Sequence, residues 1–336
     1  MARRHVVRVA VLAALACALT PVATVGAQTF AVREITPTPP FTALGADDIN
    51  ASGQVVGSLG GDLGESSAFV WDPSSGLRAL GEFDGEATVG GGINDRGVVT
   101  GAAGGSHVYF PPTAFRWTAA DGFQSLGLGT PSGINDAGQT IGYWPGPGWI
   151  VWDASGSVQP SIGQIYGIPE AINDSGQIVG YAPGAQAAQI WSQETGLGEL
   201  PPFAGGYGAS AYDINDQGVA TGTADAPYST KKRNTGCGVR ANSGCAVVWR
   251  AGRPTAVGPN TSIGYGINNN GDVVGTFIAA PSYTSHAFLS RNGVFSDLNR
   301  LVPTGTPILK EARAINDSGW IVANSEGGRA FVLIPR

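Results

Sequence analysis

The sequence contains little charge, little histidine and little cysteine, and these scarcities exclude several classes of protein. Only 13% of the 336 residues are charged, and the formal net charge is −6. An acidic chain with three lysines is a poor partner for nucleic acid. The H-E-x-x-H, G-x-S-x-G, P-loop and dinucleotide motifs are all absent. The sequence therefore lacks the signatures of the common hydrolases and nucleotide-binding enzymes, and we expect no metal and no cofactor.

The first 27 residues are predicted to be an export signal. Arginines at positions 3, 4 and 8 lie around an apolar stretch over residues 6–19, and Val25-Gly26-Ala27 precedes a cleavage site before Gln28. The apolar stretch is too short to span a membrane. Removal of residues 1–27 takes away three arginines and no acidic residue, so the net charge changes from −6 to −9. We expect a secreted or periplasmic protein without a membrane span, and we leave open whether Cys17 carries a lipid.

Long segments with helical periodicity are also missing, whereas one short motif recurs. It consists of Ile-Asn, a tight turn, a glycine and a β-branched run, and successive copies are 44, 41, 38, 42, 53 and 48 residues apart. This period is typical of propeller blades of four short strands. The seven isoleucines are Ile49, Ile93, Ile134, Ile172, Ile214, Ile267 and Ile315.

The Asn-Asp-x-Gly turn of the motif has two interpretations, a calcium-binding loop and a structural turn, and the sequence favours the turn. Asn and Asp cap turns through their own backbone, and glycine tolerates a positive φ, as a short hairpin requires. Blade one has Ala51 and blade six has Asn269 where the other copies have Asp, and no D-x-D-x-D-G loop is present. We therefore predict structural turns.

The two ends of the chain complement each other. The seventh unit stops after its third strand, while a strand-like segment over residues 30–36 precedes the first motif. Pairing of this segment beside Phe331 to Ile334 would complete the last blade and leave no open sheet edge. The predicted fold is all-β: one seven-bladed β-propeller over residues 28–336, with tryptophans 71, 117, 152, 191 and 249 packed between blades.

The third strand of blade six contains His286-Ala287-Phe288, and this segment, with the Ile-Asn-Asp-x-Gly-x-Val-x-Gly repeats, resembles the HAF family of extracellular repeat proteins. The resemblance covers the chain from about Phe30 to its end. It implies export and a propeller-like β fold, and it implies no substrate or activity. The other six copies depart from the signature histidine, at Ser67, Thr113, Gly148, Ala187, Cys245 and Arg329.

The residues two positions before each isoleucine are predicted to line the channel where the first strands enter it. A repeat that only had to fold would tolerate Gly or Ala at all seven positions. Two interpretations remain open for the charged members, a solvated ion network and a catalytic or binding site. The weak candidates for catalysis are Asp47, Glu170, Tyr212, Tyr265 and Arg313.

The long loops are predicted to share one face of the ring, opposite the tight turns, and any ligand is placed there. An insertion over residues 224–244 carries Lys231-Lys232-Arg233 and a pair of cysteines, Cys237 and Cys245, which we expect to form a disulfide. Aromatic residues of the long loops are candidates for a ligand-binding surface: Tyr109, Phe110, Trp144, Tyr166, Phe203, Tyr207 and Tyr283.

These observations favour a monomeric, exported binding or interaction module whose ligand, a carbohydrate or a protein, contacts the long-loop face. One alternative is an extracellular enzyme, such as a polysaccharide lyase or a glycosidase, that uses the residues at the channel mouth. Another is a secreted scaffold with a broad apolar patch for a protein partner.

Overall fold

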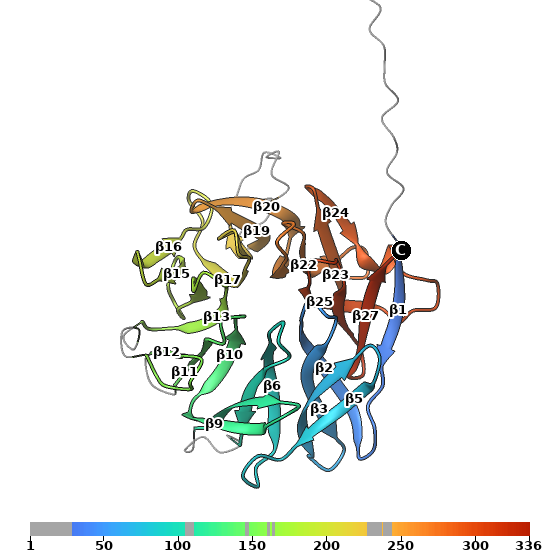
Figure 1. The fold of residues 1–336 in the computed structure, drawn as a ribbon. Helices are drawn as coiled ribbons and strands as arrows, with labels where there is room; N and C mark the ends of the chain where they lie inside the picture. The colour runs from blue at the N-terminus through green and yellow to red at the C-terminus, as the bar shows by residue number, and fades with distance from the viewer. Residues whose placement is uncertain are drawn as a thin grey trace, which may run out of the picture.

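The computed structural model describes residues 29–104, 111–144, 148–159, 162, 165–226, 237 and 244–336. Seven antiparallel sheets surround a central axis as the blades of a propeller (Figure 1). The predicted fold class is therefore confirmed. The predicted export signal lies outside the described residues.

Each blade is a short meander whose first strand lies nearest the axis. The first three blades consist of β2 (Phe41–Ile49), β3 (Val55–Gly61), β4 (Ser66–Asp72) and β5 (Gly76–Gly81); β6 (Thr88–Ile93), β7 (Val99–Ala103), β8 (Thr113–Thr118) and β9 (Gly122–Leu128); and β10 (Thr130–Ile134), β11 (Thr140–Tyr143) and β12 (Trp149–Trp152). The next two consist of β13 (Ile168–Ile172), β14 (Ile178–Tyr181), β15 (Ala188–Ser192) and β16 (Gly196–Leu200); and β17 (Ala209–Ile214), β18 (Ala220–Asp225), β19 (Gly244–Arg250) and β20 (Arg253–Asn260). The last two consist of β21 (Ser262–Ile267), β22 (Val273–Ala279), β23 (Thr284–Arg291) and β24 (Val294–Asp297); and β25 (Leu309–Ile315), β26 (Ile321–Ser325), β27 (Arg329–Pro335) and β1 (Phe30–Ile35). A 3₁₀ turn, η2 (Leu298–Arg300), follows β24.

Blade three differs from the predicted four-stranded unit. Its sheet has three strands in the part of the chain that the structure describes, and the segment after β12 contributes a single bridge between Trp152 and Val158. The turn after Trp152 is held by Asp153, whose side chain accepts hydrogen bonds from Ser155 and Ser157. Within the described residues, blade three therefore departs from the four-stranded unit that the repeat predicts.

The N-terminal segment lies beside the last strand. Strand β1 pairs with β27 from Phe30 opposite Pro335 to Ile35 opposite Ala330, at the right of Figure 1. Arg329 donates two hydrogen bonds to Glu34, of 2.7 and 2.8 Å, and these bonds lower the pKa of Glu34. First and last segments of the chain thus share one sheet.

The core lies between neighbouring blades. One cluster packs Val56 and Ala68 of blade one against Phe115 and Trp117 of blade two, and the other clusters repeat this arrangement around the ring. Trp71, Trp117, Trp152 and Trp249 are at most 5% exposed, and Trp191 is partly buried, which confirms their predicted place between blades. The tryptophan ladder is therefore structural and offers no exposed stacking surface.

Candidate binding cavity in the channel

Every inner strand carries a β-bulge at the position that the sequence analysis singled out. In each blade the register with the second strand skips one residue, the one two positions before the isoleucine. A bulge leaves this residue unpaired and re-aims its side chain. All seven bulged residues line one cavity of about 530 Å³ at the channel mouth: Asp47, Gly91, Ser132, Glu170, Tyr212, Tyr265 and Arg313.

The bulge explains why one position of the second strand is glycine in most copies of the repeat. In six blades the second strand has glycine opposite the residue that precedes the bulge, for example Gly180 opposite Pro169. A Cβ atom on Gly180 would collide with the carbonyl oxygen of Ile168, and the equivalent glycines meet the same obstacle. Blade seven has Ala323 at this position. In these six blades the glycine thus allows the close approach of the inner strand beside the bulge, whereas blade seven accommodates a methyl group there.

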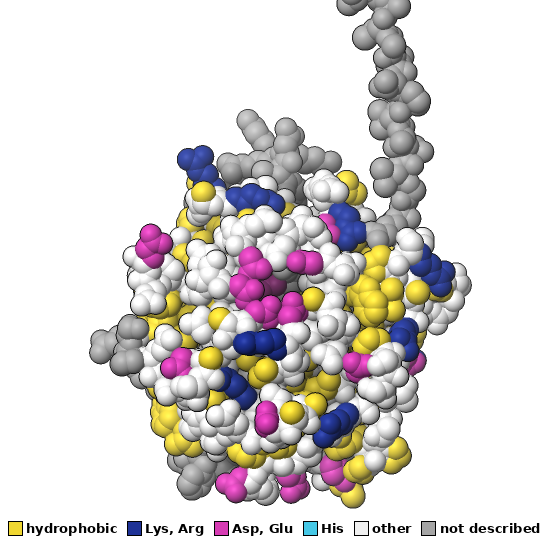
Figure 2. Space-filling view, viewed as in Figure 1, with side chains coloured by type: hydrophobic (Ala, Val, Ile, Leu, Met, Phe, Trp, Pro, Cys, Tyr) yellow, Lys and Arg dark blue, Asp and Glu magenta, His cyan; other side chains and the backbone are white. Residues whose placement is uncertain are grey.

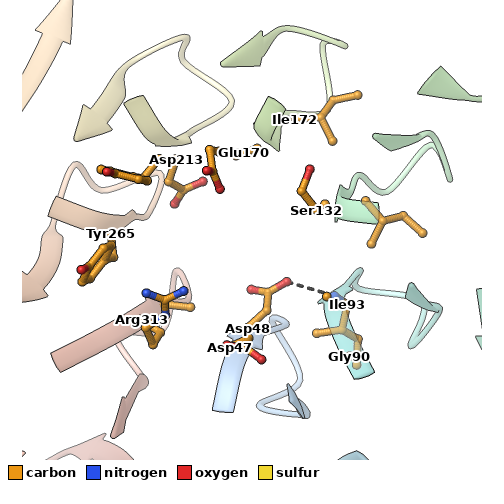
Figure 3. Close-up of a pocket in the computed structure, with 16 residues that line it drawn as sticks. Asp47, Asp48, Gly90, Ile93, Ser132, Glu170, Ile172, Asp213, Tyr265 and Arg313 are labelled. Atoms are coloured by element: carbon orange, nitrogen blue, oxygen red, sulfur yellow. Dashed lines mark hydrogen bonds between the residues drawn. The ribbon is translucent and has the colours of Figure 1, made fainter. Parts of the chain in front are cut away.

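The charged bulge residues face one another across the cavity (Figure 3). Arg313 stacks on Tyr265, with 4.6 Å between the guanidinium carbon and the ring centre. In the described part of the chain no carboxylate lies within 4.0 Å of the Arg313 guanidinium, and Asp47 and Glu170 accept no hydrogen bond. These side chains therefore keep hydrogen-bonding capacity that is directed into the cavity.

Burial changes the ionisation of the cavity carboxyl groups. Desolvation raises the pKa of Glu170 to about 7, although the Arg313 charge opposes the shift. Desolvation also raises the pKa of Asp47 to about 6, again opposed by Arg313. At neutral pH the two groups exist partly as acids and partly as carboxylates, so they can both donate and accept hydrogen bonds.

Two further aspartates of the cavity were missed from the sequence. Asp48 accepts hydrogen bonds from the backbone N–H of Ile49 and of Ile93, which belongs to the next blade, at 2.8 and 2.9 Å. Asp213 makes the same pair of bonds to Ile214 and Ile267, at 2.8 and 2.7 Å. Each carboxylate thus bridges two inner strands while it lines the cavity.

Burial dominates the titration of this second pair as well. It raises the pKa of Asp213 to about 7 and raises the pKa of Asp48, although both accept backbone hydrogen bonds. The signal was present in the sequence, since the other five blades have Gly or Ala immediately before the isoleucine.

The cavity is asymmetric. Blades two and three contribute glycines, Ser132 and the apolar side chains of Ile93 and Ile134, and no charged group (Figure 3). On the opposite side the rings of Tyr212 and Tyr265 are 5.6 Å apart between centres and tilted at 69°. Burial raises the pKa of both phenols, which therefore remain neutral hydrogen-bond donors. The result is a polar pocket with one aromatic wall.

The opposite end of the channel is built from the turns. Each motif asparagine donates through Nδ2 to the backbone oxygen of the next motif asparagine, and the seventh bond, from Asn316 to Asn50, closes the ring. Each asparagine also accepts from a backbone N–H of its own turn, as Asn173 does from Gln177. The turns are structural, as predicted, and they also join the blades.

The aspartates of the turns differ from their predicted role. They accept from the backbone N–H of the preceding blade instead of capping their own turn, as Asp174 does from Asp136 at 2.8 Å. The series is interrupted only at Ala51, among the described residues, because alanine has no acceptor. Figure 2 shows acidic side chains gathered around the central opening. The carboxylates of this opening are Asp95, Asp136, Asp174, Asp216 and Asp317.

The predicted aromatic ligand-binding surface is not assembled at the cavity. Trp144, Tyr166, Tyr207 and Tyr283 are 40–69% exposed, but none of them lines the cavity. Phe203 packs against two core clusters, because its ring covers apolar residues of blade five. Tyr109 and Phe110 lie outside the described residues.

The insertion is shorter than predicted. Ala224 and Asp225 pair with Cys245 and Gly244, so these residues extend strands β18 and β19 and do not belong to the loop. The predicted disulfide between Cys237 and Cys245 is present. The basic cluster at residues 231–233 lies outside the described part. No group of three or more His, Cys, Asp or Glu side chains arranged for a metal occurs among the described residues.

Comparison with known proteins establishes the fold. No protein-family model and no curated protein matches the chain. The structure resembles virginiamycin B lyase from Staphylococcus aureus (11% identity, 91% of this chain and 99% of that chain, TM-score 0.56). It also resembles YCF48 bound to D1 peptide (9%, 91% and 97%, 0.53) and the extracellular domain of BT4673 from B. thetaiotaomicron (10%, 90% and 39%, 0.53). Such varied neighbours share a propeller and do not define one activity.

No helix in the described part of the chain is long and apolar enough to cross a membrane.

Proposed function

We propose that this protein is a binding module that holds a neutral or positively charged carbohydrate in the channel cavity. The observation that carries the proposal is the ring of bulges, which directs Asp47, Glu170, Arg313 and two tyrosines into one pocket of about 530 Å³. Such a volume lies in the range of small-molecule sites. The residues that differ most between blades stand at a repeat position that faces this pocket in all seven blades, which supports a ligand there.

The charge of the channel favours a neutral or positively charged ligand. Four carboxyl groups and a single guanidinium line the cavity, and five more carboxylates surround the opposite opening. Low-dielectric walls strengthen such a field inside a cleft. An anionic sugar would face this negative field, whereas a neutral sugar or an amino sugar would not. The field therefore argues against the acidic polysaccharides that a polysaccharide lyase would cleave.

The chemistry of the walls suits hydroxyl groups. Glu170 and Asp47 can accept or donate near neutral pH, Arg313 only donates, and the phenols of Tyr212 and Tyr265 do both. The aromatic wall offers apolar area to the face of a sugar ring. A folded protein partner would instead contact the exposed loops, where Tyr207 and Tyr283 are isolated from the cavity.

Calorimetric titration with neutral, amine-bearing and uronic sugars tests the proposal. We expect binding of neutral or amine-bearing sugars, and Glu170→Gln or Arg313→Ala should weaken it at least tenfold. The matched controls are Glu199→Gln and Arg253→Ala, which change exposed residues of the outer strands β16 and β20. Tighter binding of uronic sugars, or an equal loss in the control variants, would overturn the proposal.

A second candidate function is glycoside hydrolysis at the same site. It is favoured by Glu170, because a carboxyl group whose pKa is raised to about 7 is suited to general acid catalysis. Asp47 would then supply the second carboxylate that such enzymes use. Release of reducing sugar by the wild type, abolished in Glu170→Gln while binding persists, would establish this activity. Binding without release would leave the binding module.

We further propose that the protein is exported and belongs to the HAF repeat family. The disulfide supports an oxidising compartment, and the seven repeats support the family. Export is tested by fractionation of the producing cell and sequencing of the mature N-terminus, which we expect at Gln28. A cytoplasmic chain with an intact N-terminus would contradict it.

A further inference from the structure

We infer that the ligand is the end of an extended carbohydrate chain whose following units lie in a groove over blades five, six and seven. This inference rests on the proposed function. It arises from a second depression of about 590 Å³, which opens beside the cavity and is formed by β18, β21, β22, β25 and β26. A chain of several units would occupy both depressions, whereas one sugar would fill only one of them.

Tyr265 connects the two depressions. Its ring belongs to the bulge ring of the cavity, stacks under Arg313, and also lines the groove. A ligand that contacts this ring in the cavity therefore has a direct route into the groove. Over blades two and three the described cavity wall consists of Gly90, Gly91, Ile93, Ser132, Gly133 and Ile134, and none of these residues lines the groove. The position of Tyr265 thus gives the chain a direction, from the axis outward over blade six.

The groove has the mixed character that a sugar chain requires. Phe277 and Ile278 of β22 supply apolar surface, and Ile278 is 37% exposed. The hydroxyl groups of Thr261 and Ser285 make no hydrogen bond within the described part of the chain, so they remain available to a ligand. Ser285 lies directly opposite Ile278 in the paired strands β22 and β23. Hydroxyl donors and apolar area therefore alternate along one wall.

Of the charged residues of the groove, Lys310 is ion-paired, whereas Asp225 and Glu311 have no partner of opposite charge among the described residues. Lys310 lies 2.8 Å from Glu326, and Glu311 accepts a hydrogen bond from Asn324 at 3.2 Å. The groove consequently offers no free cation to anchor a carboxylate, and its two carboxyl groups disfavour an anionic unit. This feature favours units that repeat the neutral chemistry of the first sugar. A peptide chain is the competing occupant and becomes an outcome of the test.

The test measures affinity as a function of chain length. The purified full chain is titrated with β-1,4-linked glucose, β-1,4-linked mannose and β-1,4-linked N-acetylglucosamine oligomers of one to six units, and with seryl and glycyl peptides of two to six residues. We expect one carbohydrate series to bind at least tenfold more tightly at four units than at one. Ser285→Trp, which fills the groove, should abolish this gain. The milder Ser285→Ala should reduce it about threefold.

The matched control is Ser318→Trp, an exposed turn residue on the opposite face. It should keep both the monosaccharide affinity and the gain with length. Failure of every sugar to bind would overturn the proposed function itself. Equal affinity for one and four units would overturn only the groove, as would a gain that survives Ser285→Trp. Length-dependent binding of the peptides alone would overturn the carbohydrate assignment.

Discussion

The asparagine ring makes a quantitative prediction at Asn173. Its side chain is 3% exposed, accepts from Gln177 N–H at 2.9 Å and donates to the Asn215 carbonyl oxygen at 2.9 Å. Replacement by alanine removes these two bonds and a third, from Nδ2 to Gln177 Oε1, and leaves the Gln177 N–H without a partner, whereas the Asn215 oxygen still accepts from Gly218 N–H. Each lost bond costs about 1 kcal/mol, and each stranded group adds about 1 kcal/mol or more. We therefore expect Asn173→Ala to lower the free energy of unfolding by about 3–4 kcal/mol.

Two companion variants separate the hydrogen bonds from packing. Asn173→Asp keeps the shape but places an acceptor against the Asn215 carbonyl oxygen, so it should cost about as much at pH 7 and less at acid pH, where the carboxyl group is protonated. Asp174→Ala removes one exposed bond from the same turn, at 2.8 Å, and also relieves repulsion from Asp136 and Asp216. Its expected cost is below about 1 kcal/mol.

The assay is urea unfolding followed by tryptophan fluorescence and circular dichroism. The comparison requires coincident transitions and an unchanged dependence on urea, since only then does the midpoint report stability. A loss below about 1 kcal/mol for Asn173→Ala, or equal losses for Asn173→Ala and Asp174→Ala, would refute the idea that the asparagine ring joins the blades.

Three further predictions use the same assay. Gly180→Ala should cost about 2–3 kcal/mol of stability, because its Cβ would collide with the Ile168 carbonyl oxygen. Gly60→Ala, with open space around it, should change stability by less than about 0.5 kcal/mol. Equal effects of the two substitutions would contradict the role of the bulge. Ala51→Asn should stabilise the protein by about 0.5–1 kcal/mol, because it supplies the acceptor that the Asp317 N–H lacks. Ala51→Asp should stabilise it less, because it adds a sixth carboxylate to this opening. No increase in stability from either substitution would count against the inter-blade bond. Burial raises the pKa of Glu170 from 4.5 to about 7, so the unfolded chain ionises first and this group costs stability as the pH rises from about 4.5 to 7. The free energy of unfolding of Glu170→Gln should therefore exceed that of the wild type by about 1–3 kcal/mol at pH 8 and match it at pH 4. A difference that does not depend on pH would refute the assignment.

The sequence determined the ring and one layer of the cavity, because both depend on a repeat. The spacing of the isoleucines predicts the blades, and comparison of the residues two positions before them predicts Asp47, Glu170 and Arg313, which the structure brings together. Neither the spacing nor this comparison explains why these side chains turn inward. The reason is the bulge, a feature of register between two strands, and its only trace in the sequence is the glycine of the second strand, such as Gly180.

Contacts between blades were harder to predict. The turn aspartates were expected to cap their own turns, but Asp174 accepts from Asp136 N–H, which lies 38 residues earlier and becomes a neighbour only when the ring closes. Asp48 reaches Ile93 in the same way. The place of Phe203 was hard to predict for a related reason, since composition does not reveal whether a loop aromatic covers core or solvent. Long-range geometry decides these cases, and a single sequence does not contain it.

The two ends of the channel divide stability from recognition. At the turn end the seven blades are nearly equivalent, and their equivalence is what allows each asparagine to bond to the next until Asn316 meets Asn50. At the cavity end the bulge isolates one side chain per blade from the ladder, so this residue can vary without breaking a backbone hydrogen bond. Changes at Glu170 should therefore alter ligand binding at little cost in stability, or even with a gain, whereas changes at Asn173 should do the reverse. Variants at the two positions that lose stability and binding in parallel would show that this division is false.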